Sequence, residues 1–411
     1  MNHTIFDSYY INKILIIKME VKLNIIQPEL NQQELKILQP EVEIKILQPS
    51  LEINILQNKP KILQTSSGSQ LTKGQQNSLF KQGYRMVGNH SAVKICEYTR
   101  KMLRGQGGCY KYAFYGIRSH QCMQMTTSMF CANRCKFCWR GQKAPVSETW
   151  YGPIDSPEHI INHAIDEHLK LLQGFKGMGY DKANKKRVSE MENVRHVALS
   201  LTGEPITYPL INEILKAFHK RRVSTFLVTN SQYPEQIKKV DKVTQLYLSI
   251  DAPNKELMKK IDNPLFKDFW ERMLACLKLL KTRTYRTCIR LTMIKNENMC
   301  NPEGYAELIK LGSPYFVELK SYVHVGASRN FYQQENMPTL EEMKVFMNQL
   351  LKYLPDYEFL RQHSHSRAIL LIKRSLNKKS WINFPKFFEL VENNKEFTTE
   401  DYCSEIIMPN E

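Results

Sequence analysis

The sequence has no long apolar run, which argues against a membrane-spanning protein and against a secreted one. The apolar run ILII at 14–17 lies between Lys13 and Lys18, and no small-residue cleavage site follows it. A membrane-spanning helix needs roughly 20 apolar residues, and a secretory signal needs a cleavage site. We therefore expect no membrane partner and a cytoplasmic protein, whose cysteines stay reduced and bind metal more often than they form disulfides.

Acidic residues are also scarce, with 41 Asp and Glu against 58 Lys and Arg, which gives a formal net charge of +17. One interpretation is a lysine-rich, solvated surface. The other is a polyanionic partner, with nucleic acid favoured over membrane. Charge alone does not separate the two interpretations.

The first 75 residues differ in composition from the rest, because variants of the unit ILQP recur at intervals of roughly nine residues. Recurrent prolines oppose a continuous helix, and the unit is too short for a common solenoid. We expect residues 1–75 to form a low-complexity, largely disordered leader, with a small β-solenoid as the alternative. No chemistry is assigned to this leader.

Beyond the leader, segments rich in β-branched residues alternate with amphipathic segments. The predicted strands cover 124–130, 194–201, 223–229, 244–250, 287–294 and 315–322. The predicted helices cover 157–175, 209–222, 265–281, 302–312 and 339–354. This alternation predicts an α/β fold with a parallel sheet. Six βα repeats indicate an incomplete TIM-like (β/α)6 barrel, with its chemistry on the loops after the strands.

One cysteine motif lacks the fourth ligand that metal sites usually have. Cys131, Cys135 and Cys138 stand at the spacing C-x3-C-x2-C. Three thiolates at this spacing fit three irons of a [4Fe–4S] cube and leave the fourth iron open for another ligand. The alternative is a zinc knuckle whose fourth ligand lies far away in the sequence.

A second set of cysteines lies just upstream, with Cys96, Cys109 and Cys122 separated by 13 residues twice. This regular spacing indicates a second cluster with its own open iron. We expect the other cysteines to be packing residues. They are Cys276, Cys288, Cys300 and Cys403.

The motif CANRCKFCWR (131–140) and the stretches around it resemble the radical S-adenosylmethionine (SAM) tRNA 4-demethylwyosine synthases of wybutosine biosynthesis. The resemblance extends over roughly residues 80–375. It includes LSLTGEPITYP (199–209), FLVTNSQYP (226–234), LYLSIDAP (246–253) and ELKSYVHVGASR (318–329). It implies an auxiliary-cluster extension at 76–123, a radical SAM barrel at 124–335, and C-terminal helices and a strand at 336–411 that complete the core.

The resemblance implies an enzyme that condenses N1-methylguanosine at position 37 of phenylalanine tRNA, in the anticodon loop, with pyruvate to form a tricyclic base. Cys131, Cys135 and Cys138 would hold the [4Fe–4S] cluster that binds SAM. The three upstream cysteines would hold an auxiliary [4Fe–4S] cluster. Lys111, two residues after Cys109, matches the lysine proposed to form an imine with pyruvate.

The resemblance also implies a set of binding residues at the strand ends. The expected SAM contacts are Gly203, Glu204, Pro205, Asn230, Ser249 and Asp251. The alternative is that TGEP is an ordinary turn and that the polar residues merely cap helices. Substrate or phosphate contacts are expected from Lys320, His324, Arg329, Arg283, Arg286, Arg290 and the basic segments 182–187 and 216–222.

Three residues depart from the family pattern, namely Gln121 in place of arginine, Gln124 in place of glutamate and Ser128 in place of proline. The leader has no phosphate-binding loop, so we expect no FMN in this chain. We expect an external electron donor, such as a flavodoxin-type reductase, with an incomplete gene model as the alternative. Two alternatives stay open. One is another radical SAM enzyme that modifies RNA or a peptide, and the other is a non-catalytic, zinc-dependent RNA-binding protein.

Overall fold

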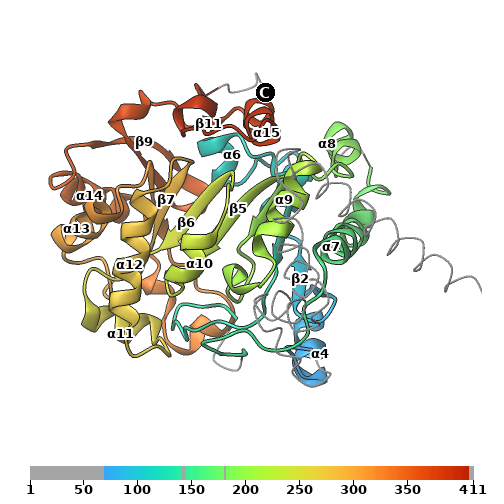
Figure 1. Cartoon of the computed structure of the whole chain (residues 1–411), viewed down its shortest axis with the longest axis horizontal. Coiled ribbons are helices and arrows are strands. Elements are labelled where there is room, and N and C mark those ends of the chain that lie inside the picture. Colours follow the sequence, from blue (N-terminus) through green and yellow to red (C-terminus); the bar gives the residue numbers. More distant parts are fainter. Residues whose placement is uncertain (1–68, 141–143, 180–181, 407–411) are drawn as a thin grey trace, which may run out of the picture. The chain divides into compact units, whose positions relative to one another are not determined.

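The computed structural model describes residues 69–140, 144–179 and 182–406 (Figure 1). Contacts divide the chain into two compact units, residues 1–63 and 64–411. The first unit lies outside the described residues, as does the predicted leader up to residue 68 with its ILQP repeats. The predicted leader boundary at residue 75 falls inside helix α4, which spans Lys73–Lys81 and begins with a capping box at Thr72.

Within the described residues, ten strands form one sheet in the order β1-β2-β3-β4-β5-β6-β7-β8-β10-β9. Strands β3 to β8 pair in parallel, and the outer strands at both edges pair antiparallel. The strands are β1 (Tyr84–Val87), β2 (Ser91–Lys94), β3 (Cys122–Thr126), β4 (His196–Leu199), β5 (Ser224–Thr229), β6 (Gln245–Ser249), β7 (Thr287–Met293), β8 (Phe316–Ser321), β9 (Tyr357–His363) and β10 (Ala368–Lys373). Strands β11 (Trp381–Ile382) and β12 (Cys403–Ser404) form a separate antiparallel pair.

The predicted α/β fold with a largely parallel sheet is confirmed, because the six predicted strands correspond to β3 through β8. The antiparallel strands at the two edges were not predicted. Closure of the sheet into a partial barrel stays a prediction. Since parallel strands end at the same edge, the segments that follow β3, β4 and β5 are brought together there.

The helices surround the central strands (Figure 1). Besides α4 they are α5 (Glu97–Leu103), α6 (Tyr110–Tyr115), α7 (Pro157–Leu172), α8 (Lys185–Glu190), α9 (Ile211–Lys220), α10 (Pro234–Lys239), α11 (Lys255–Asp262), α12 (Phe269–Lys281), α13 (Pro302–Gly312), α14 (Leu340–Leu351) and α15 (Phe384–Glu392). Capping residues and prolines in the sequence mark where helices begin. For example, Ser156 accepts a hydrogen bond from the backbone of His159, and Pro157 takes the first position of α7.

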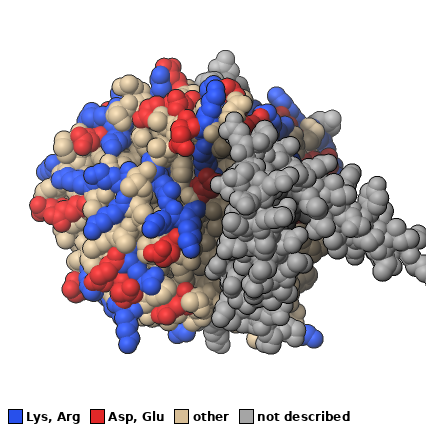
Figure 2. All heavy atoms as spheres, viewed as in Figure 1, with Lys and Arg blue, Asp and Glu red and all other residues tan. Residues whose placement is uncertain are grey.

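Charged side chains of both signs lie on the face of the molecule that Figure 2 shows. Figure 2 shows basic side chains mixed with acidic ones over the described part of the visible face. No helix of the described residues is long and apolar enough to span a membrane.

Candidate active site

A cavity of about 210 Å³ lies beside the C-terminal ends of β3 and β4. All three thiols of the C-x3-C-x2-C motif line it, together with Gly203. Cys131 belongs to the loop after β3 and Gly203 to the loop after β4, and these two strands pair in parallel. The fold therefore places the predicted cluster motif and the TGEP turn around one space.

The TGEP turn depends on glycine at position 203. Gly203 has a φ of +64°, and a Cβ there would come within 1.9 Å of the backbone oxygen of Ser128. The same oxygen accepts a hydrogen bond of 2.8 Å from the Thr126 hydroxyl. The backbone N–H of Glu204 donates to the oxygen of Phe130 at 2.8 Å. These contacts hold the turn against the segment that leads into Cys131.

Polar groups are directed at the sulfur of Cys131. The backbone N–H of Asn133 and the side-chain amide of Asn230 donate to it, at 3.4 and 3.3 Å. Burial raises the pKa of Cys131 to about 11, and the nearby Arg140 guanidinium opposes that shift. Hydrogen-bond donors and a buried cation stabilise a thiolate, so this environment fits cysteines that bind iron. Arg140 follows Cys138 by two residues, and its role was not predicted from the sequence.

Glu204 is a buried carboxylate, and only one of its two oxygens has a hydrogen-bond partner among the described residues. It is 1% exposed, and its Oε2 accepts a hydrogen bond of 2.9 Å from the backbone of Asn230. Its Oε1 has no hydrogen-bond partner among the described residues. Burial raises the pKa of Glu204 to about 8. A buried carboxylate oxygen without a partner fits a cationic ligand such as the ammonium group of an amino acid.

A second cavity of about 240 Å³ contains the three upstream cysteines and Lys111. Cys96 is the N-cap of α5, Cys109 is the N-cap of α6, and Cys122 is the first residue of β3. Burial raises the pKa of Cys109 and of Cys122 to about 12. The 13-residue spacing therefore corresponds to the starts of three successive elements whose cysteines share one space.

Within the described residues, no three His, Cys, Asp or Glu side chains are placed to hold a single metal ion. In a cube-type cluster each cysteine binds a different iron. Three thiols distributed around a cavity are therefore the donor set that such a cluster takes, and each of the two cavities provides one.

Lys111 is buried in the wall of the second cavity. Burial lowers the pKa of Lys111, and the Arg290 guanidinium lowers it further. Its Nζ lies 5.2 Å from the ring centroid of Tyr247. Arg290 is itself paired with the fully buried Glu318 at 2.8 Å. A lysine whose neutral form is favoured in this way is a nucleophile toward carbonyl groups.

Lys320 is a second lysine with a shifted pKa, which burial lowers to about 8. Its Nζ donates to the backbone oxygens of Ser366, at 2.6 Å, and of Ser321, at 3.2 Å. Lys320 does not line either of the two cavities. The structure therefore favours Lys111 over Lys320 as the reactive amine.

Ser200 lines both cavities. It directly follows β4, and its backbone N–H donates to the oxygen of Met125 on β3 at 3.1 Å. The two cysteine sets therefore meet at this residue. Ser200 was not predicted, because nothing in the sequence distinguishes it from other serines at strand ends.

Two further predicted SAM contacts, Ser249 and Asp251, lie at the end of β6 and just after it. Ser249 and Asp251 do not line either cavity. The Oδ1 of Asp251 accepts a hydrogen bond of 3.0 Å from the backbone of Thr292, and the backbone oxygen of Ser249 accepts one of 3.1 Å from the Ser231 hydroxyl. Pro205 is buried beside Gly203 and Glu204.

The three residues that depart from the family pattern have different surroundings. Gln124 lines the second cavity. Gln121 is buried, and its side-chain amide donates to the backbone oxygens of Glu190 and Asn193, at 3.2 and 3.1 Å. The hydroxyl of Ser128 is buried without a partner among the described residues.

Two expectations from the sequence are wrong. Arg286 is fully buried and donates to the backbone oxygen of Ser380 at 2.7 Å, so it does not contact a phosphate at the surface. Cys300 is exposed and is not a core residue. Arg283 donates to the backbone oxygen of Lys238 at 3.1 Å, near the end of α10.

Comparison with known proteins gives two family matches. Residues 125–309 match the radical SAM superfamily, and residues 311–373 match a family described as wyosine base formation. The two matches together cover the C-x3-C-x2-C motif, the last residues of β3 and the strands β4 to β10.

Individual relatives agree with these matches. A mouse S-adenosyl-L-methionine-dependent tRNA 4-demethylwyosine synthase is 44% identical over 84% of this chain and 49% of its own length. The rice synthase is 46% identical over 80% of this chain and 51% of its own length. A solved structure of TYW1 with a lysine-pyruvate adduct bound is 33% identical, with a TM-score of 0.67, over 77% of this chain and 99% of that one. The chain spans about half the length of the curated relatives it matches.

Proposed function

The chain belongs to the radical SAM family of tRNA 4-demethylwyosine synthases, and from this premise we propose that it forms the tricyclic 4-demethylwyosine base. Its substrates would be pyruvate and phenylalanine tRNA that carries N1-methylguanosine at position 37 of the anticodon loop. The observation that carries this proposal is the pair of cavities that meet at Ser200, each with three cysteines.

The first cavity is proposed to hold the [4Fe–4S] cluster and SAM that membership of the radical SAM family implies. Cys131, Cys135 and Cys138 would bind three irons. When bound, this group supplies the 5′-deoxyadenosyl radical. The partnerless Oε1 of Glu204 would accept a hydrogen bond from the ammonium group of SAM. Gly203 keeps the turn close enough to the cysteine loop for this contact.

The second cavity is proposed to hold the auxiliary cluster and pyruvate. Cys96, Cys109 and Cys122 would bind the cluster, and Lys111 would form an imine with the keto group of pyruvate. One water leaves as the C=N bond forms, and the amine must give up its proton to react. Burial and Arg290 both favour that neutral amine. The related TYW1 structure is described as having a lysine-pyruvate adduct bound, which supports a lysine in this role.

The test is anaerobic reconstitution followed by a complete reaction. We expect about eight irons per chain, four for each cluster, and 5′-deoxyadenosine that forms only with a reductant. With N1-methylguanosine tRNA, SAM, pyruvate and dithionite, nucleoside mass analysis is expected to detect the tricyclic base. Omission of pyruvate is the matched control and is expected to abolish that product.

Two outcomes would contradict the proposal. Zinc in place of iron, with no SAM cleavage, would favour a zinc-dependent RNA-binding protein. Reductant-dependent SAM cleavage with no tricyclic base, on a tRNA that a known synthase converts, would favour a radical SAM enzyme with another substrate.

A further inference from the structure

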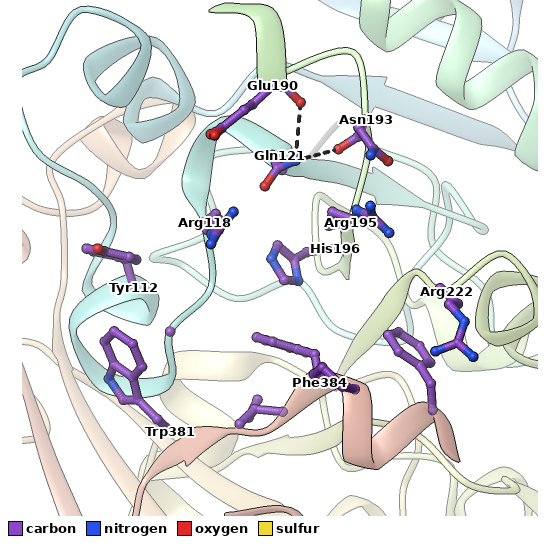
Figure 3. Close-up of a pocket in the computed structure, with 14 residues that line it drawn as sticks. Tyr112, Arg118, Gln121, Glu190, Asn193, Arg195, His196, Arg222, Trp381 and Phe384 are labelled. Atoms are coloured by element: carbon purple, nitrogen blue, oxygen red, sulfur yellow. Dashed lines mark hydrogen bonds between the residues drawn. The ribbon is translucent and has the colours of Figure 1, made fainter. Parts of the chain in front are cut away.

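A third cavity, of about 760 Å³, lies at the N-terminal ends of β3 and β4, the opposite ends from the TGEP turn. Figure 3 shows Arg118 and Arg195 on one side of it, Trp381 and Phe384 on the other, and the His196 ring between them. None of the residues that line it is a cysteine or Lys111. The proposed reaction therefore leaves this cavity without a role.

The charge of the lining is positive. Arg118, Arg195 and Arg222 line the cavity, against one carboxylate, Glu190. Arg222 is paired with Glu392 at 3.0 Å, and Glu190 is hydrogen-bonded to His120 at 2.7 Å. Neither Arg118 nor Arg195 makes an ion pair within the part of the chain that the structure describes.

His196 lies in the cavity wall, where the positive charges of Arg118 and Arg195 act on its ring. It is buried, and its Nδ1 is hydrogen-bonded to the Ser224 hydroxyl at 2.8 Å. Burial, together with the charges of Arg118 and Arg195, lowers the pKa of His196 to about 3. The ring is therefore neutral, and neither arginine is ion-paired with Glu190 or with another described residue of the wall.

The facing side of the cavity is aromatic and fixed in place. The Trp381 indole N–H donates to the backbone oxygen of Ala113 at 3.2 Å, and its ring packs against Gly116, where a Cβ would lie 3.0 Å away. The Phe384 ring centroid lies 4.7 Å from that of His196. These rings offer a preordered apolar surface beside two free guanidinium groups.

We propose that this cavity binds a nucleotide, with the phosphate on Arg118 and Arg195 and the base against Phe384 and Trp381. Guanidinium groups bind phosphate through paired hydrogen bonds, and bases stack on aromatic side chains. The volume lies within the roughly 300–1,000 Å³ of small-molecule sites. A bare anion does not account for the aromatic surface, and an apolar ligand does not account for the unpaired arginines.

The nucleotide could belong to either of two sources, a free mononucleotide or one unit of an RNA chain, since both present the same base and phosphate. Residues that are adjacent in the sequence line the nucleotide cavity and the second cysteine cavity. Tyr112 lines the nucleotide cavity while Lys111 lines the other, and Gln121 and Cys122 divide in the same way.

The test measures binding of AMP, adenosine, inorganic phosphate and a short single-stranded RNA to the reconstituted full chain by calorimetry. We expect AMP or the RNA to bind, and Arg118→Gln/Arg195→Gln to weaken that binding about tenfold or more. Phe384→Leu is expected to weaken AMP or RNA binding without changing the binding of phosphate. Binding of AMP identifies the free nucleotide as the source, and binding of RNA without AMP identifies a unit of a chain.

The matched control is Arg221→Gln, because Arg221 is the neighbour of Arg222, pairs with the exposed Glu158 and does not line the cavity. An equal loss of RNA binding in Arg221→Gln and in the double variant would overturn the proposal, since it would reflect net charge alone. The proposal is also overturned if wild type binds none of the probes at millimolar concentration. AMP that binds no more tightly than inorganic phosphate, with an affinity that Phe384→Leu leaves unchanged, would overturn it as well.

Discussion

The side-chain amide of Asn230 donates a hydrogen bond of 3.3 Å to the sulfur of Cys131, which lies 99 residues earlier in the chain. The backbone N–H of the same asparagine donates to Glu204 at 2.9 Å. One residue after β5 therefore connects the cysteine motif after β3 with the carboxylate after β4. This link fixes the free oxygen of Glu204 in relation to the proposed cluster, and the first prediction depends on it.

Glu204→Gln is expected to weaken SAM binding about tenfold to a hundredfold, because a neutral amide replaces a carboxylate that would pair with an ammonium group. The iron content is expected to stay at the wild-type value, since Glu204 is not a cysteine ligand. Equilibrium dialysis with labelled SAM on reconstituted protein measures the affinity. Wild-type affinity in a variant with full iron content would remove Glu204 from the SAM site.

Glu204 also predicts how the stability of the cluster-free protein varies with pH. Its pKa of about 8 in the fold lies above the ordinary value of 4.5, so between these values the folded state holds a proton that the unfolded chain has lost. The stabilisation from that proton is complete below pH 4.5 and is lost as the pH rises through about 8. In urea unfolding from pH 5 to 8.5, this group is expected to lower the free energy of unfolding by up to about 1.4 kcal/mol for each unit of rising pH. The slope is expected to be shallower in Glu204→Gln, and equal slopes would contradict this prediction.

Borohydride trapping with pyruvate is expected to distinguish the two buried lysines. Reduction of an imine leaves a stable adduct, which peptide mass analysis locates. We expect the adduct on Lys111 in wild type, none in Lys111→Ala and an undiminished adduct in Lys320→Ala, whose amine is engaged by two backbone oxygens. SAM cleavage is expected to continue in Lys111→Ala. An adduct that persists in Lys111→Ala and disappears in Lys320→Ala would move the role to Lys320.

The central strands could be predicted because they are buried on both faces and rich in β-branched residues, as in β5, STFLVT. The edge strand β9, YEFLRQH, is only partly buried and mixes charged with apolar residues, so its pattern does not mark a strand. The last residues of the predicted leader, from Lys73 on, belong to helix α4 for a similar local reason. Thr72 and Gln75 form a capping box, which repeat composition does not reveal.

The candidate site could be predicted only in part, because polar residues after strands look alike in a sequence. Glu204 and Asp251 both follow strands and are both buried. The carboxylate of Asp251 accepts a backbone hydrogen bond from Thr292, while one oxygen of Glu204 has no partner among the described residues. This difference in hydrogen bonding comes from tertiary packing and cannot be predicted from the sequence, and the role of either carboxylate in SAM binding stays a prediction.

Gly203→Ala is expected to destabilise the fold by at least about 1–3 kcal/mol, because the φ of +64° is strained for alanine. The new Cβ would also meet the backbone oxygen of Ser128 at 1.9 Å, so the turn must move away from the cysteine loop. Gly174→Ala is the matched control, since a Cβ there meets nothing within 4 Å. The midpoint of urea unfolding measures both variants, and equal midpoints would show that the turn tolerates a side chain.

Loss of one charge from the ion pair between Arg290 and Glu318, beside the second cavity, is expected to lower the free energy of unfolding. Glu318 is fully buried and also accepts a hydrogen bond of 2.7 Å from the Tyr115 hydroxyl. Glu318→Gln leaves Arg290 with an uncompensated charge in a buried site, which costs about 3–5 kcal/mol in the free energy of unfolding.

The control for this variant is Glu392→Gln, which breaks the exposed pair with Arg222 and is expected to cost less than about 1 kcal/mol. Urea unfolding at one pH compares the two. A similar small cost for both would mean that water reaches Arg290 through the cavity. In that case the guanidinium would be too well solvated to lower the pKa of Lys111, and burial alone would have to favour the neutral amine.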